Sequence, residues 1–228
     1  MTQLIAFSGK IASGKSTTAR HINSRFYQGR ARHTSFASPL RDEVAMLMRL
    51  YSPNDDQFYH TLLASPLEMP DSSSLLEKFI VTTTSSGLDG NELYRLMMQS
   101  WGTDVRRADD PYYWVKRTMN TVRKNAIKGV TTVIDDCRFT NEADAILSAC
   151  GVLIRLDIDP QEQLRRLTEI RGISHDNDIL AHPSETQLDD YQKFSLRVDN
   201  TNPEDAEKEI LSLLSEREDA AWERSQCE

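Results

Sequence analysis

The stretch Gly9-Lys10-Ile11-Ala12-Ser13-Gly14-Lys15-Ser16 has the spacing G-x-x-x-x-G-K-S. The apolar residues 4–7 precede it and predict a short buried strand, and residues 17–22 continue it as the beginning of a helix. In that context the pattern is typical of a phosphate-binding loop, because the glycines permit a tight turn whose N–H groups surround a polyphosphate. The lysine of such a loop reaches the β- and γ-phosphates, and the hydroxyl after it ligates Mg²⁺. The stretch therefore predicts a nucleoside triphosphate site, with Lys15 and Ser16 in these two roles.

Composition and charge narrow the classes to which the chain can belong. Its 228 residues suit one large domain or a domain with a substantial insertion, and 39% hydrophobic residues are ordinary for a soluble globular protein. The net charge of -8 argues against a surface that coats nucleic acid. No apolar run is long enough to span a bilayer, and the N-terminus enters a strand without a leader. We therefore expect a cytoplasmic protein without nucleic-acid or membrane partners. Cys137, Cys150 and Cys227 form no C-x-x-C pair, which suits a reducing compartment.

Segments of strand character recur along the chain between segments with helical spacing. Beyond the first strand, strands are expected at residues 33–37, 130–134, 152–156 and 196–198. Helices are expected at residues 15–26, 38–48, 92–102, 110–122, 141–150, 159–171, 184–191 and 203–214, with a frayed tail beyond residue 215. Because strands alternate with helices, the sequence predicts an α/β fold with a parallel sheet of about five strands and helices on both faces.

Residues 51–91 interrupt this pattern, since proline, serine and threonine clusters separate short apolar pieces. We expect an inserted, partly helical and mobile region rather than a separate domain. The next helix is expected to end at Gly102, and residues 103–109 to form a polar loop before Asp110-Pro111 begins another helix. The predicted organisation is a single domain over residues 1–228, with a helical insertion on the substrate side at about 39–128.

Acidic residues end the apolar segment 130–134, where Asp135-Asp136 follows. A buried strand that ends in an aspartate is what a phosphate-loop protein uses to hold the magnesium shell. Solvated aspartates at the end of an ordinary strand are the alternative. The phosphate loop favours the metal role, because it gives an independent reason to expect a carboxylate there.

Arginines gather on the helix expected at 159–171, at positions 165, 166 and 171. A polar segment and a short return helix follow, so that residues of about 165–192 resemble a lid that closes over a bound polyphosphate. The alternative is that these arginines form the outer face of an ordinary helix.

Several short motifs are spread in order from residue 9 to residue 185. They are the phosphate loop; Phe36-Ala37-Ser38-Pro39-Leu40-Arg41; Arg95-x-x-x-Gln99-x-x-Gly102-Thr103-Asp104-x-x-Arg107 with Trp114-Val115; Asp136-Cys137-Arg138-Phe139-Thr140-Asn141-Glu142-Ala143; and His182-Pro183-Ser184-Glu185. Together they resemble the deoxynucleoside monophosphate kinases of bacteriophages, which tend to have F-A-x-P-L-K and D-x-R-F-x-N-E-A at the corresponding places. The loop alone is generic to many kinases and ATPases, whereas the ordered set is far more specific.

The resemblance implies a P-loop kinase fold and a reaction. The γ-phosphoryl group of Mg-ATP is transferred to the 5′-phosphate of a deoxynucleotide, and the diphosphate results. ATP and Mg²⁺ are the implied cofactors, small nucleotides are the implied partners, and a homodimer is the implied assembly. Arg41 stands where the family usually has lysine, which bears on base preference rather than on activity.

The resemblance also assigns roles by position. The ATP-binding residues are Gly9, Lys10, Ala12, Ser13, Gly14, Lys15, Ser16 and Thr17, with Arg166 and Arg171 in the lid. The substrate-binding residues are Phe36, Arg41, Arg95, Gln99, Trp101, Thr103, Asp104, Arg107, Trp114, Arg138 and Glu142. The catalytic residues are Lys15, Arg107, Arg138 and Asp136, and Ser16 and Asp136 hold the metal.

Two other functions fit part of the pattern. Another small-molecule kinase, acting on dephospho-coenzyme A or a sugar acid, would keep Lys15, Ser16, Asp136 and the lid arginines. It would have no use for the set Arg95, Gln99, Asp104 and Arg107. A nucleotide-dependent regulatory module is the second alternative. The sequence has neither N-K-x-D nor D-x-x-G, which argues against a GTPase switch, and a slow ATP-binding regulator would leave the arginines unexplained.

Overall fold

The structure is a computed structural model that describes residues 3–171 and 183–225. The chain divides into two compact units, one of Met1–Ser35 with Met119–Glu228 and one of Phe36–Thr118. We call the first the sheet unit and the second the helical unit, and we describe each by itself.

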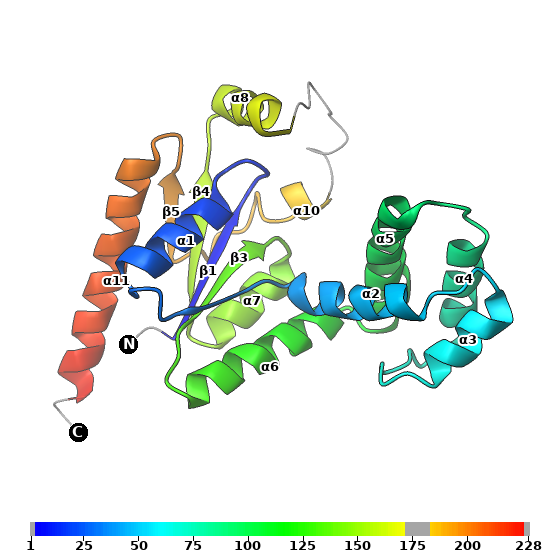
Figure 1. Cartoon of the computed structure of the whole chain (residues 1–228). Helices are drawn as coiled ribbons and strands as arrows, with labels where there is room; N and C mark the ends of the chain where they lie inside the picture. Colours follow the sequence, from blue (N-terminus) through cyan, green and yellow to red (C-terminus); the bar gives the residue numbers. More distant parts are fainter. Residues whose placement is uncertain (1–2, 172–182, 226–228) are drawn as a thin grey trace. The chain divides into compact units, whose positions relative to one another are not determined.

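The sheet unit contains five parallel strands in the order β2-β3-β1-β4-β5 (Figure 1). The three central strands are almost entirely buried, which explains their nearly continuous apolar sequences. This sheet confirms the predicted α/β fold and the parallel arrangement. The strands are β1 (Leu4–Gly9), β2 (Arg32–Thr34), β3 (Thr132–Cys137), β4 (Val152–Asp157) and β5 (Leu196–Asp199).

Helices cover both faces of this sheet. On one face Ile5 and Phe7 of β1 pack in a core with Ile22 of α1 (Lys15–Arg25) and Ile210 of α11 (Pro203–Ser225). Successive side chains of a strand point to opposite faces, so Ala6 of β1 lies on the other face, and α7 (Thr140–Ser148) contacts β1 and β4. The remaining helices of the unit are α8 (Pro160–Arg171), α10 (Pro183–Thr186) and the later part of α6 (Tyr113–Ile127).

The register between β1 and β3 shifts where both strands approach the phosphate loop. Ala6 pairs with Ile134, but Ser8 pairs with Cys137. Residues 135–136 of β3 therefore lie opposite a single residue of β1, which is the arrangement of a β-bulge. A bulge re-aims side chains, so the register alone does not give the direction of the two aspartates.

The helical unit has a hydrophobic core of its own. The core brings together Leu47, Phe58, Phe79, Met97 and Trp101, one from each of its helical segments. These segments are α2 (Ser38–Leu50), α3 (Asp55–Leu63), α4 (Ser73–Thr84), α5 (Gly90–Gln99) and η1 (Ser100–Arg107). The unit overlaps the insertion expected at about 39–128, and that insertion and the single-domain organisation stay predictions.

The region 51–91, which is expected to be partly helical, contains two helices, α3 and α4, because apolar residues on each bury against the common core. Two element boundaries differ from the sequence-based expectation. The last helix continues to Ser225 rather than ending near residue 214. The return helix expected at 184–191 is short and spans only Pro183–Thr186, and residues 172–182 of the expected lid lie outside the described part of the chain.

Gly102 does not end a helix, and the expected polar loop at 103–109 is wrong. The helix continues through Gly102 as the π-helix η1. A Cβ at Gly102 would lie 2.8 Å from Leu40 Cδ2, so glycine allows close packing there instead of stopping the helix. Within the described ranges, none of the helices combines the length and the apolar character needed to cross a bilayer.

Candidate active site

The phosphate loop requires glycine at two positions of the turn between β1 and α1. Gly9 has φ +149°, and a Cβ there would lie 2.5 Å from both Leu156 O and Ser13 Oγ. Gly14 has φ +91°, and a Cβ there would lie 2.5 Å from Asn200 Nδ2. Both conformations are ones that L side chains rarely adopt. The two glycines of the pattern therefore have a steric reason in the fold itself.

Lys15 bends back across the loop. Its Nζ donates to Gly9 O at 2.7 Å and to Lys10 O at 2.8 Å. Burial and, to a smaller extent, the positive charge of Arg138 lower the pKa of Lys15 to about 8. An anionic ligand at the loop would favour the charged form, since a nearby negative charge stabilises an ammonium group.

Side chains from two distant segments hold the outer rim of the loop. Gln163 Nε2 of α8 donates to Ile11 O at 2.9 Å, and Asn200 Nδ2, which follows β5, donates to Ser13 O at 2.6 Å. Both Gln163 and Asn200 are buried. The backbone of the loop is therefore held in one conformation without a ligand, which reduces the ordering required when a polyphosphate binds.

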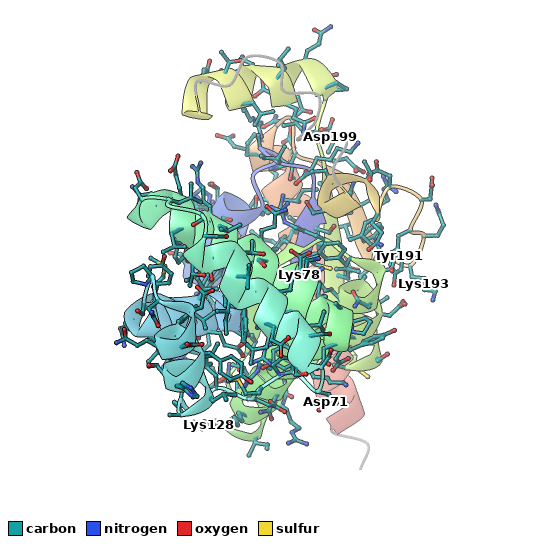
Figure 2. All side chains as sticks on the ribbon, turned by 90° about the vertical axis from the view of Figure 1, so that its right-hand side faces the viewer. Asp71, Lys78, Lys128, Tyr191, Lys193 and Asp199 are labelled. Atoms are coloured by element: carbon teal, nitrogen blue, oxygen red, sulfur yellow. The ribbon has the colours of Figure 1, made fainter. Side chains whose placement is uncertain are left out.

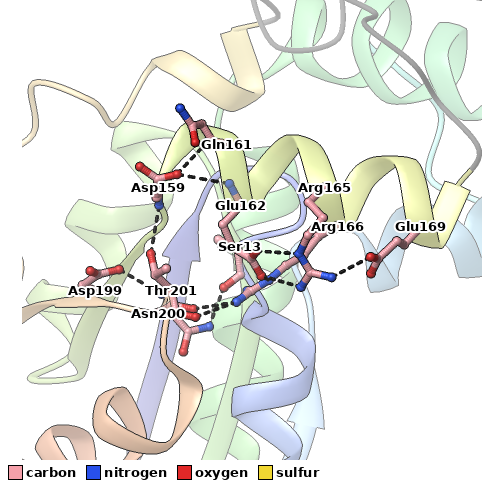
Figure 3. A network of polar contacts seen from close by, with 10 residues as sticks. All are labelled: Ser13, Asp159, Gln161, Glu162, Arg165, Arg166, Glu169, Asp199, Asn200 and Thr201. Atoms are coloured by element: carbon pink, nitrogen blue, oxygen red, sulfur yellow. Dashed lines mark hydrogen bonds and ion pairs between the residues drawn. The ribbon is translucent and has the colours of Figure 1, made fainter.

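Arg166, which the resemblance gives to the lid, joins this supporting network (Figure 3). Its Nε donates to Glu162 at 2.7 Å, and its Nη2 donates to the carbonyl oxygens of Asn200 and Thr201 at 3.0 and 3.1 Å. In this structure Arg166 therefore ties α8 to the segment after β5. The side chain of Arg171 lies outside the described residues.

The carboxylate that contacts Ser16 belongs to Asp135, one residue before the expected Asp136. Asp135 accepts a hydrogen bond from the Ser16 hydroxyl, and His33 Nε2 lies 3.3 Å from Asp135 Oδ2. Burial would raise the pKa of Asp135, but the hydrogen bonds from His33 and Ser16 outweigh it and leave that pKa below its usual value. The same hydrogen bond to Asp135 raises the pKa of His33. An ionised carboxylate therefore stands beside the hydroxyl of the loop.

Arg138, expected to contact a phosphate, lies in the turn between β3 and α7. Its Nη1 forms an ion pair of 2.5 Å with Glu185 Oε1. Glu142, expected to bind substrate, is buried, and its Oε2 accepts from the N–H groups of Arg138 and Phe139 at 2.8 and 3.2 Å. Glu142 thus caps the beginning of α7 and orients the backbone of Arg138, a role that its i,i+4 spacing from Arg138 could have suggested.

The helical unit contains a buried charged network around Glu43 of α2. Its Oε2 accepts from Trp101 Nε1 at 2.7 Å and from Arg106 Nε at 3.1 Å, and its Oε1 accepts from Tyr113 OH at 2.7 Å. Arg117 Nη2 lies 2.9 Å from the same Oε1. Arg106 is 1% exposed and lies 4.6 Å from the Trp101 ring centroid and 4.3 Å from that of Tyr113. Sequence reasoning missed this network because only a π-helix brings residues five apart onto one face.

Two of the expected substrate-binding residues belong to the hydrophobic core. Trp101 is fully buried, and Trp114 is 2% exposed and donates from Nε1 to Gly102 O at 3.0 Å. A ligand cannot stack on either ring unless the core opens. Phe36 is also buried, at 3% exposed.

Other expected substrate residues have accessible side chains on the helical unit. Arg41 on α2 and the i,i+4 pair Arg95 and Gln99 on α5 are exposed, and Arg107 is partly exposed. Thr103 and Asp104 are exposed on η1. These positions combine positive charge with amide and hydroxyl groups, which suits recognition of a phosphate together with a polar base or sugar.

Comparisons with known proteins find a relative that is named a kinase and solved structures of kinases. A protein of Acanthamoeba polyphaga mimivirus named "Putative deoxynucleotide monophosphate kinase" is 27% identical over 216 residues, which cover 92% of this chain and 95% of that protein. No family model matches the sequence. Among solved structures, a gluconokinase from Sinorhizobium meliloti 1021 matches with a TM-score of 0.51 and 14% identity over 98% of both chains. A dephospho-CoA kinase from Campylobacter jejuni matches with a TM-score of 0.43, 14% identity and coverage of 94% and 96%.

The first of these structures shows the fold: the chain has a P-loop kinase fold, as the sequence predicts. The related protein is viral, but it comes from a virus of amoebae, so a relation to bacteriophages in particular stays a prediction.

Proposed function

We propose that the protein transfers the γ-phosphoryl group of Mg-ATP to the 5′-phosphate of a deoxynucleoside monophosphate. An oxygen of the acceptor phosphate forms a bond to the γ-phosphorus, the bond from that phosphorus to the bridging oxygen breaks, and ADP leaves. The observation that carries the kinase assignment is the geometry of the phosphate loop, in which Gly9 and Gly14 are sterically required and Lys15 bends back across the turn, with the Asp135 carboxylate of β3 beside Ser16. The choice of acceptor rests on the ordered motifs and on the 27% identity to the viral protein.

The residues at the loop fit a triphosphate with Mg²⁺. Across the described ranges, no cluster of three or more His, Cys, Asp or Glu side chains could form a metal cage. Mg²⁺ does not need one, because it usually keeps several waters and binds through one or two carboxylates and substrate phosphates. Ser16 and Asp135 supply a hydroxyl and a carboxylate of that kind, so we assign them to the metal in place of Ser16 and Asp136. When bound, Mg²⁺ neutralises charge on the β- and γ-phosphate oxygens.

The acceptor chemistry asks little of a general base. A phosphate oxygen is already ionised at neutral pH, so the protein has to align two anions and neutralise their charge. Arginine suits this task because its planar fork of N–H donors matches phosphate oxygens. We assign the acceptor phosphate to Arg41, Arg95, Arg107 and Arg138, and the base or sugar to Gln99 and Asp104.

An ADP-release assay tests the proposal. Mg-ATP is supplied with dAMP, dCMP, dGMP or dTMP, with the four ribonucleotides, with dephospho-coenzyme A, with gluconate, or without acceptor. We expect turnover with at least one deoxynucleotide, abolished in Lys15→Ala and lowered about 10³-fold in Arg107→Ala by analogy with arginine fingers.

The acceptor panel also separates the alternatives. ADP release above the no-acceptor control only with dephospho-coenzyme A or gluconate would replace the proposed acceptor while keeping the kinase. ATP binding without ADP release for any acceptor would favour a regulatory module.

A further inference from the structure

Glu185 joins the phosphate loop to Arg138. Its carboxylate is 5% exposed and lies on α10 in the sheet unit. Oε2 accepts from Ile11 N of the loop at 2.5 Å, and Oε1 accepts from Arg138 Nη1 at 2.5 Å. One carboxylate therefore bridges Arg138, which is expected to contact the acceptor phosphate, and the loop that is expected to hold ATP.

The surroundings of Glu185 explain why a charged carboxylate is stable there. Burying an unpaired carboxylate is very unfavourable, but here a guanidinium and a backbone N–H each use one of its oxygens. Lys15 also interacts favourably with Glu185, whereas Arg138 and Arg155 oppose the charge on Lys15. Glu185 thus offsets the repulsion among three cations that lie around the loop.

A second carboxylate after α10, that of Asp189, forms an ion pair with Lys10, the loop residue before Ile11. Asp189 is four residues after Glu185. Its Oδ2 lies 3.0 Å from Lys10 Nζ, and its Oδ1 lies 2.7 Å from Arg155 Nη2. Arg155 is buried in β4. Lys10 and Ile11 are consecutive, so the segment of α10 holds two successive residues of the loop.

The peptide groups of Ile11 are held from both sides. Gln163 Nε2 donates to Ile11 O at 2.9 Å, while Glu185 accepts from Ile11 N. Tyr191 and Lys193 of the chain after Glu185 lie near each other (Figure 2). Both contact α7: Tyr191 OH donates to Asp144 at 2.7 Å, and Lys193 Nζ lies 3.6 Å from the same carboxylate. Glu185 therefore extends from a segment anchored on α7 and has little freedom to follow Arg138 if Arg138 moves.

We propose that Glu185 is a positioning residue, which sets the place of the Arg138 guanidinium relative to the phosphate loop. The inference rests on the proposed function, because it takes Arg138 as a contact of the acceptor phosphate. A guanidinium has five N–H donors in a rigid plane, so a pair through Nη1 orients the plane without using all donors. The two carboxylate oxygens of Glu185 thereby set the distance between the phosphate loop and the Arg138 guanidinium.

A double-mutant cycle of Glu185→Ala and Arg138→Ala tests the inference by kcat. Displacing a catalytic group by about 1 Å can lower the rate about 10²-fold, so we expect that loss for Glu185→Ala. We expect a change below about threefold in KM for ATP, and a loss of about 10³-fold for Arg138→Ala. If Glu185 acts through Arg138, the double variant loses no more than Arg138→Ala alone, because effects of residues that act as a unit are not additive.

Two further variants control for folding and for charge. Glu185→Gln keeps the size of the side chain, but its amide has one acceptor and one donor group where two donors face it, so one of the two contacts is lost. We expect a loss of kcat in a protein that still folds, with a lower thermal-unfolding temperature because one buried donor is left unpaired. Asp190→Asn removes a carboxylate from an exposed position on the same segment and is expected to leave kcat unchanged. If Glu185→Ala does not fold, the cycle is run with Glu185→Gln.

The outcomes separate the two proposals. Multiplicative losses in the double variant, or a folded Glu185→Gln protein with wild-type kcat, would overturn the positioning role while the kinase assignment stands. Wild-type turnover of another acceptor would overturn the deoxynucleotide assignment, and the cycle would then be measured with that acceptor. No wild-type turnover of any acceptor would overturn both, before any variant is compared.

Discussion

Asp135, rather than Asp136, should control the response of the enzyme to Mg²⁺. Replacing Asp135 by asparagine removes the negative charge beside the Ser16 hydroxyl but keeps the volume of the side chain and an acceptor oxygen. Groups that orient or support a metal shell typically contribute 10- to 100-fold to metal affinity. We therefore expect the Mg²⁺ concentration for half-maximal activity to rise about 10- to 100-fold in Asp135→Asn, with much of kcat recovered at saturating Mg²⁺.

The matched control for this experiment is the neighbouring substitution, Asp136→Asn. It removes the same charge from the same strand, one residue further along. ADP release is measured against Mg²⁺ concentration at fixed ATP and acceptor. If Asp135 is the metal residue, the Mg²⁺ concentration for half-maximal activity should change less than about threefold in Asp136→Asn. A larger shift in Asp136→Asn than in Asp135→Asn would refute the assignment made from the Ser16 contact.

Three other predictions concern stability and the loop. Glu43→Ala should lower the free energy of unfolding by about 3–5 kcal/mol, measured by urea denaturation, because Arg106 would stay buried without its carboxylate. Trp101→Phe should lower the free energy of unfolding by about 1–3 kcal/mol, because the hydrogen bond to Glu43 is lost. A rise in the KM for the acceptor without a loss of stability would instead indicate that Trp101 binds substrate. Because the pKa of Lys15 is about 8 in the folded protein and 10.5 in an unperturbed lysine, the unfolded chain binds more protons between these pH values. The unfolding free energy should therefore rise with pH across this window by up to about 3 kcal/mol relative to Lys15→Met, and an equal pH dependence in both proteins would contradict the lowered pKa.

The sequence by itself determined the features that depend on local patterns. The phosphate loop was recognisable because its glycines, lysine and serine lie within eight consecutive residues, between an apolar strand and a helix. The five parallel strands followed from the alternation of β-branched runs with amphipathic helices, which restricts the topology to a few choices. Most helices of the sheet unit were found for the same reason.

Tertiary packing decided what local patterns leave open. Glycine often ends a helix, but the π-helix η1 runs through Gly102, where the missing Cβ leaves room for the Leu40 side chain. Proline and serine clusters predict only a partly helical region at 51–91, without bounds for its helices. Burial of Phe58 and Phe79 in the helical core decides where α3 and α4 form. Propensity is a weak prior that burial of apolar surface overrides.

The direction and depth of individual side chains also came only from the tertiary structure. Two consecutive aspartates end β3, and a register shift against β1 lies at that point, so sequence could not tell which carboxylate meets Ser16. Trp101 looks like a ligand-stacking residue in a polar motif, but burial places it in the core. Glu185 reaches Ile11 across 174 residues of chain, and no local pattern encodes a contact that long-range folding alone creates.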